Sequence, residues 1–171
     1  MFNRKGIVVF LGLSFLLVAG IGLIKKPIKI PVHPVPLVIK TKRGAVIYKV
    51  ELAFTALQSS TGLMYRTDFP RDRAVLFKNR VNDQKSEQEM FMWMANTPLP
   101  LDMIFLNAEG TIVSIVEKTE PFSTDIISSK VPATFVIEVN AGEVSEKQIQ
   151  KGQRVIHSAI CGECKSNKND R

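Results

Sequence analysis

The chain has 171 residues, of which 45% are hydrophobic, so it fits one domain with a sizeable core and is not a disordered chain. Its net charge of +7 comes from the N-terminal quarter, because residues 1–44 hold eight Lys or Arg and no acid, whereas residues 45–171 hold 15 basic and 16 acidic residues. The nearly neutral domain argues against nucleic-acid binding, which needs clustered basic residues, and two cysteines are too few for a disulfide framework.

The first segment is a long apolar run. Residues 6–24 contain one polar side chain, Ser14, and are flanked by Lys and Arg on both sides. As a helix this run spans just under the ~30 Å of a membrane's hydrocarbon core. We predict that residues 1–26 form an uncleaved signal anchor; a signal peptide cleaved near Val18-Ala19-Gly20 and a buried core helix are the alternatives. The domain is then expected in the cell envelope, anchored in the inner membrane and facing the periplasm or the outside, or exported after cleavage.

A proline-rich linker is predicted next, over residues 27–37. Four of the nine prolines fall between Pro27 and Pro36, and no acid lies near them. Such a stretch favours an extended, polyproline-like conformation. We therefore expect a stalk, in which His33 is solvated rather than catalytic.

The folded domain is predicted over residues 38–158, followed by a flexible tail over residues 159–171. Alternating apolar and polar residues indicate strands, and Gly110 ends a polar turn typical of a hairpin. Strands are expected at 45–53, 74–78, 90–94, 102–106, 111–118, 134–140 and 153–157, and helices at 55–62 and 143–150. This pattern predicts a β-rich α+β domain, with a small mixed sheet or partly closed barrel and two short helices, preceded by the N-terminal transmembrane or signal helix.

Four stretches of the chain follow one another in an order that is specific to one family: residues 62–66, 76–77, 93–105 and 137–142. On these stretches the chain resembles DUF192, a bacterial and archaeal family of unknown function, over about residues 46–156. The resemblance implies a single β-rich domain, often behind an export signal, and supplies no established activity. The family usually has Lys where this chain has Ala95 and Asp where it has Gln153, which puts in doubt any site that relies on them.

The polar residues inside these stretches are the candidates for a ligand-binding site. Asn96, Thr97 and Asp102 bracket two prolines, which remove backbone donors and stiffen the segment. The alternative is a structural turn, in which Asn and Asp side chains accept hydrogen bonds from backbone N–H groups.

Arg66, Glu138 and Trp93 complete the candidate set. Glu138 interrupts an apolar strand and Arg66 follows a predicted helix, so the two are expected to form a partly buried ion pair or the polar floor of a pocket. Trp93 is the single tryptophan, and it either belongs to the core or walls that pocket.

Two features of the sequence suggest metal or redox chemistry. Met90, Met92 and Met94 alternate along a predicted strand, so their thioethers share one face, and thioether is a ligand for Cu(I); packing is the alternative. Cys161 and Cys164 form a Cys-x-x-Cys motif. In an oxidising compartment these cysteines are expected to form a disulfide, with redox or metal-binding roles as the alternatives.

The sequence thus favours a membrane-tethered, extracytoplasmic domain that binds a ligand or a protein. Its expected partners are the membrane, through the N-terminal helix, and an unidentified protein or small molecule; no nucleic acid is expected and no cofactor is strongly indicated. The common catalytic motifs are absent from the sequence. One alternative is a carboxylate-dependent enzyme, which requires two of the acids Asp68, Asp72, Asp102 and Glu138 to meet in a cleft. The other is a Cu(I) or redox module.

Overall fold

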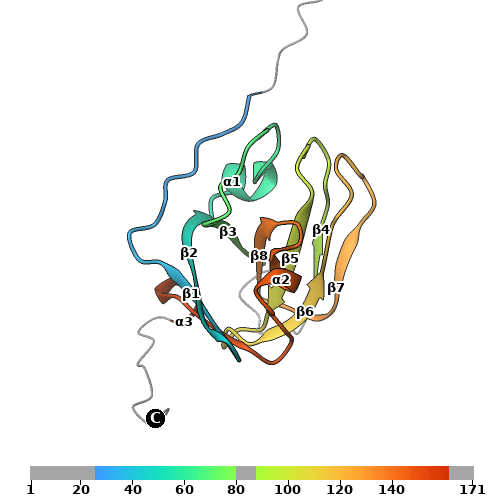
Figure 1. Cartoon of the computed structure of the whole chain (residues 1–171). Helices are drawn as coiled ribbons and strands as arrows, with labels where there is room; N and C mark the ends of the chain where they lie inside the picture. The colour runs from blue at the N-terminus through green and yellow to red at the C-terminus, as the bar shows by residue number, and fades with distance from the viewer. Residues whose placement is uncertain (1–25, 80–87, 162–171) are drawn as a thin grey trace, which may run out of the picture.

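The computed structural model describes residues 26–79 and 88–161. Nine strands and three short helices lie within these ranges (Figure 1). In chain order they are β1 (Leu37–Thr41), β2 (Gly44–Ala53), α1 (Ala56–Thr61), β3 (Arg73–Lys78), β4 (Glu89–Met92), β5 (Leu101–Leu106), β6 (Ile112–Val116), β7 (Ile127–Pro132), β8 (Phe135–Asn140), α2 (Glu143–Glu146), β9 (Arg154–Ile156) and α3 (Ser158–Cys161).

Seven strands form one sheet in the order β6-β5-β8-β3-β2-β1-β9, and β4 pairs with β7 in a separate ribbon. Strands β2 and β3 run parallel, and their neighbours pair antiparallel. The two edges of the sheet meet where Thr111, just before β6, forms an antiparallel bridge with Arg154 of β9. The sheet is therefore nearly closed, in agreement with the predicted β-rich fold, and the described residues contain three short helices rather than two.

An apolar core lies on each face of this sheet. Side chains from all seven strands meet in the inner core, for example Tyr48, Ile104 and Ile137. The outer core lies between the sheet and the β4–β7 ribbon, where Met103 packs in one cluster with Met90. Strand β5 is buried along its whole length, because it contributes side chains to both cores. A polar residue on β5, or on β8 before its last residue Asn140, is therefore buried whichever way it points.

Helix α1 is positioned by its two ends. The Thr55 hydroxyl accepts a hydrogen bond from the Gln58 N–H, and the Gln58 side chain accepts one from the Thr55 N–H, so a capping box begins the helix. Gly62 ends it with a φ of 48°, and a Cβ at this position would lie 2.9 Å from the Phe77 ring. This close approach directs the chain onto the outer core at Leu63.

Two strands were not predicted from the sequence pattern. Strand β1 begins directly after Pro36, in the stretch predicted as linker, and pairs with both β2 and β9. Strand β7 contains two serines, a lysine and Pro132, so it lacks a clear apolar alternation. Both strands form because neighbouring strands supply the hydrogen-bond partners, which no local pattern reveals.

The proline-rich segment before β1 packs against the domain, so between residues 27 and 36 it does not stand free as a stalk. Ile30 is buried in the outer core, Val32 forms a bridge with Glu51, and the His33 N–H donates to the Val50 carbonyl at 2.7 Å. The described helices are all too short to cross a membrane. The predicted anchor lies outside the described residues.

Candidate functional site

A groove runs along the outer face of the domain between α1 and β4. It holds a cavity of about 460 Å³, and its rim carries three exposed apolar side chains, Phe91 (61% exposed), Trp93 (51%) and Ile126 (63%). A much smaller cavity of about 20 Å³ adjoins it. The two cavities share Ser59, Ser60, Phe77, Met92 and Trp93 as lining residues, so they form one continuous depression.

Glu138 lines the small cavity. It lies on β8 between the inward-facing Ile137 and Val139, so its side chain points to the outer face. On the flanking strands its neighbours are the apolar residues Val75 and Met103. The side chain is 4% exposed, and this burial raises the pKa of the Glu138 carboxyl to about 8. At neutral pH the carboxyl is therefore protonated.

No described residue donates a hydrogen bond to the Glu138 carboxyl or forms an ion pair with it. The other buried acids among the described residues all have such partners. Glu51 is bound by two arginines, and Glu143 accepts hydrogen bonds from the Tyr48 hydroxyl and the Lys147 ammonium group. Asp102 accepts from two backbone N–H groups. Buried acids are usually paired. Glu138 is thus a largely buried acid with no partner in the described protein, and its carboxyl oxygens remain open to the small cavity.

The structure brings three of the predicted site residues together. Trp93 and Thr97 line the small cavity together with Glu138. Trp93 was expected either in the core or in the wall of a pocket. It is half exposed and forms part of the wall of this cavity. Thr97 is buried, and its position follows from backbone hydrogen bonds to Met94 and Phe122 on either side of it.

Asp102 and Asn96 take structural positions in the same region. Asp102 points to the inner face, where its Oδ1 accepts from the Lys118 N–H at 2.8 Å and its Oδ2 from the Val144 N–H at 3.0 Å. Asn96 is exposed and has a φ of 58°, and its carbonyl accepts from the Tyr65 N–H. The two residues therefore build the turn and the sheet end, which is the structural alternative considered for them.

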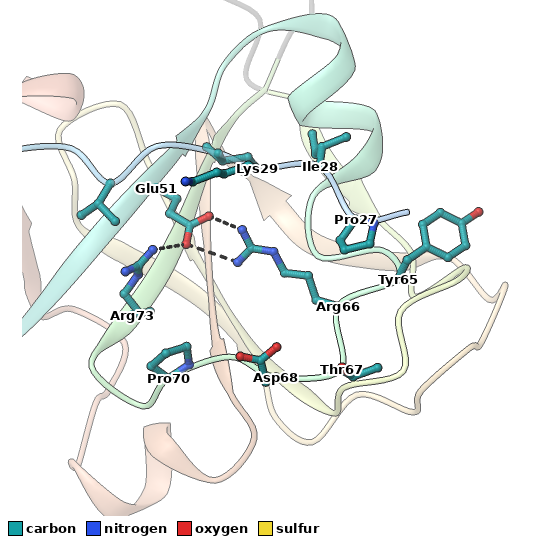
Figure 2. Close-up of a pocket in the computed structure, with 12 residues that line it drawn as sticks. Pro27, Ile28, Lys29, Glu51, Tyr65, Arg66, Thr67, Asp68, Pro70 and Arg73 are labelled. Atoms are coloured by element: carbon teal, nitrogen blue, oxygen red, sulfur yellow. Dashed lines mark hydrogen bonds and ion pairs between the residues drawn. The ribbon is translucent and has the colours of Figure 1, made fainter. Parts of the chain in front are cut away.

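Arg66 lies in a different cavity, and the predicted ion pair with Glu138 is wrong. Figure 2 shows that Arg66 and Arg73 approach the buried Glu51 carboxylate from opposite sides, with Nη–Oε distances of 2.6 and 2.7 Å. This cavity, of about 550 Å³, is also lined by Asp68 and by residues 27–30. The error arose because Glu51 is brought to Arg66 by tertiary packing rather than by sequence proximity.

The four acids considered for catalysis are dispersed. Asp68 lines the arginine cavity, whereas Asp72 forms an exposed ion pair with Lys49 at 2.7 Å. Asp102 faces the inner core, and Glu138 lines the small cavity on the outer face. Among the described residues that line the small cavity, Glu138 is the one acid. The structure therefore does not bring two of these four acids together in the small cavity.

The three methionines share one face, as the alternation predicted. Met90 and Met94 are buried in the outer core and Met92 packs against it. The Met94 sulfur accepts a hydrogen bond from the Thr119 hydroxyl. The face therefore packs against the core, and copper binding there stays a prediction. Cys164 lies outside the described residues, so its disulfide with Cys161 also stays a prediction.

Sequence reasoning missed the contribution of α1 to the site. Ser59, Ser60 and Thr61 line the small cavity from the helix, and Gly62 closes it. The capping box and Gly62 mark the helix in the sequence, but no local sequence pattern indicates that the helix and Glu138 line the same cavity. His33 was also misread: its Nδ1 lies 3.2 Å from Nε2 of the buried His157, so it is not simply solvated.

Comparisons with known proteins agree with the resemblance. The chain matches the DUF192 family, described as uncharacterized ACR, over residues 38–157, and no curated protein matches it. It is similar to the crystal structure of a candidate transcription regulator from Sinorhizobium meliloti, with 35% identity and a TM-score of 0.66 over 75% of this chain and 96% of that chain. A protein of unknown function from Novosphingobium aromaticivorans shows 25% identity and a TM-score of 0.66 over 77% and 95%. Because the family match covers most of its length, the chain belongs to the DUF192 family.

Proposed function

We propose that this domain is a ligand-binding module whose site is the groove between α1 and β4. The observation that carries the proposal is the Glu138 carboxyl, which is buried, lines a cavity and has no partner among the described residues. The Glu138 oxygens are open to the small cavity and have no protein partner among the described residues, so a donor group of a ligand can bind them there. The site is therefore suited to bind a molecule with a polar head.

The shape of the groove supports the same proposal. The small cavity beside Glu138 accepts one small polar group, whereas the larger cavity has room for an apolar body. Exposed aromatic side chains at the rim, Phe91 and Trp93, offer large contact areas that water otherwise covers. The larger cavity is also lined by polar residues, among them Lys78 and Glu89, and a depression with apolar walls and a few polar groups is the usual form of a small-ligand site.

The proposal includes a tether to a membrane. The apolar run of residues 6–24 is long enough for a membrane-spanning helix, and the groove-bearing domain follows it after a short linker. We expect the full chain to stay in the membrane fraction after carbonate extraction, and externally added protease to degrade the domain in spheroplasts. Release of the chain by carbonate, or protection from the protease, would contradict the tether or its orientation.

The groove can be tested with a label at its rim. Trp93 is the one tryptophan of the chain, so 5-fluorotryptophan gives a single ¹⁹F signal from the full chain in lipid nanodiscs. The probes are pentylamine, 1-pentanol and pentanoate, which share an alkyl body and differ in the head group. We expect at least one of them to shift the signal in a saturable way.

Two substitutions on α1 form the control. Ser60→Phe fills the groove, whereas Ala56→Phe adds the same ring to an exposed position of the same helix that does not line it. Binding should be lost in Ser60→Phe and kept in Ala56→Phe. If no probe shifts the signal, or if Ser60→Phe binds as well as the unaltered chain, the groove is not the site.

A further inference from the structure

We propose that the head group bound beside Glu138 is a primary ammonium group, carried on an aliphatic chain that occupies the larger part of the groove. This inference rests on the proposed ligand-binding groove and names the class of ligand. It follows from three properties of the small cavity: its charge, its size and its hydrogen-bonding groups.

The charge of the cavity favours a cation. Glu138 is the one ionisable side chain among the described residues that line the small cavity. An anionic ligand would oppose ionisation of Glu138 and would meet no cationic side chain among the described residues that line the small cavity. A cation instead stabilises the ionised form of Glu138 and offsets the cost of its burial. The aromatic rings of Phe77 and Trp93 in the same wall also favour a positive charge.

The size of the cavity selects among cations. Its volume of about 20 Å³ is close to the space that one water molecule needs. An ammonium group has the dimensions of a water molecule, whereas a planar guanidinium group is several times larger. The groove continues into the cavity of about 460 Å³, which is lined by apolar side chains such as Met90 and Ile126 and also by the oppositely charged pair of residue types Lys78 and Glu89. An unbranched alkylamine fits this combination of a narrow end and a wide apolar body.

The hydrogen-bonding groups match an ammonium group. An ammonium group has three N–H donors. The residues that line the cavity carry side-chain oxygen atoms that can accept hydrogen bonds, namely the two carboxylate oxygens of Glu138 and the hydroxyl oxygens of Thr97, Ser59, Ser60 and Thr61. An alcohol has a single donor and leaves most of these acceptors without a partner.

Binding must release a proton at neutral pH. The free site holds the protonated Glu138 carboxyl, and the ligand enters as an ammonium ion, so the O–H bond of Glu138 breaks and one proton passes to the solvent. The ion pair then joins a carboxylate to an ammonium group. The observed affinity should therefore rise as the pH rises toward 8, with about a tenfold change per pH unit below that value.

The three five-carbon probes test this inference by the ¹⁹F signal of fluorotryptophan at position 93. In the unaltered chain pentylamine should bind at least about tenfold more tightly than 1-pentanol at pH 8, and pentanoate should not bind. Pentylamine should bind about tenfold or more weakly at pH 6. Calorimetry in buffers with different ionisation enthalpies should show release of nearly one proton per pentylamine at pH 7.

Glu138→Gln keeps the size of the side chain and removes the negative charge. It should weaken pentylamine binding by about tenfold or more and abolish its pH dependence. Glu109→Gln, an exposed glutamate in the turn between β5 and β6, is the matched control and should bind as the unaltered chain does. The comparison of probes in the unaltered chain stands even if the Glu138→Gln variant does not fold.

The outcomes separate the two proposals. If 1-pentanol binds in the groove as tightly as pentylamine, the groove remains a ligand site and the ammonium inference is wrong. If none of the probes binds, both proposals fall. Nα-acetyl-lysine methylamide distinguishes two sources of the same chemistry: its binding identifies the lysine side chain of a peptide, whereas binding of pentylamine alone identifies a free alkylamine.

Discussion

Strands β5 and β8 each carry one buried acid, on opposite faces of the sheet, and the two acids differ in whether the protein supplies them with hydrogen-bond donors. On the inner face, Asp102 accepts hydrogen bonds from two backbone N–H groups and thereby connects β5 to the turn at Lys118 and to α2. On the outer face, Glu138 lies one strand away, beside a cavity and without a partner in the described residues. Burial alone therefore does not assign a role to an acid. An acid that accepts hydrogen bonds from the protein stabilises the fold, whereas an acid without a protein donor can accept them from a ligand.

The largest expected effect concerns the pH dependence of stability. The pKa of the Glu138 carboxyl is about 8 in the folded chain and about 4.5 in the unfolded chain, so the folded state holds one more proton between these values. The free energy of unfolding contributed by Glu138 is complete below pH 4.5 and is lost as the pH rises through 8, by up to about 5 kcal/mol. Urea unfolding of the full chain in nanodiscs between pH 5 and 9 measures this loss.

Glu138→Gln serves as the control for that titration. The variant has no carboxyl to ionise at this position, so its free energy of unfolding should fall much less between pH 5 and 9. An equal decline in both chains would show that Glu138 is not the group responsible, and the contrast between the two faces would lose its basis.

Removal of Asp102 is expected to have the second largest effect. Asp102→Ala leaves the N–H groups of Lys118 and Val144 without their acceptors, which should lower the free energy of unfolding by about 3 kcal/mol. Urea unfolding at pH 5 checks this, because Glu138 is then protonated. If Asp102→Ala proved as stable as the unaltered chain but lost ligand binding, the roles of the two faces would be reversed.

Glu51 is a third buried acid, and Arg66 is one of its two partners. Arg66→Met removes the arginine with the bidentate contact to Glu51 and leaves Arg73, so we expect a loss of about 2 kcal/mol in the free energy of unfolding. Lys49→Met, which breaks an exposed ion pair with Asp72, should have little effect. Binding of pentylamine should be unchanged in Arg66→Met, and its loss would connect the two cavities.

The smallest expected effect lies at the contact between the linker and the domain. The Ala159 N–H donates to Nδ1 of His157, which places the proton of the neutral ring on Nε2, facing His33 and the Val35 carbonyl. Burial, with a smaller contribution from His33, lowers the pKa of His157 below 6.5. The unfolded state then binds more protons, so stability is lost as the pH falls below 6.5. The protection factors of the amides in residues 32–36, taken relative to intrinsic exchange at each pH, should decrease there, but not in His157→Phe.

Local patterns in the sequence predicted much of the fold. Thr55 and Gly62 marked both ends of α1, and the alternation of apolar residues marked β2 and β8. Glu138 was also visible, because a single acid in an otherwise apolar strand is unusual. Its partner was assigned wrongly, since Arg66 is bound to Glu51 through the packing of β2 against the segment after α1.

Local patterns thus predicted most of the strands, the ends of α1 and the polar residues that fall among apolar ones, because these features depend on neighbours along the chain, whereas β1 and β7 depend on pairing with distant strands. The tertiary structure alone decided which buried acid has a partner. Strand order placed Asp102 toward the inner core, where α2 supplies a donor, and left Glu138 under α1, which supplies none among the described residues. Hydrogen-bond partners of buried groups come from distant segments, and only their packing determines whether such a group is satisfied or free for a ligand.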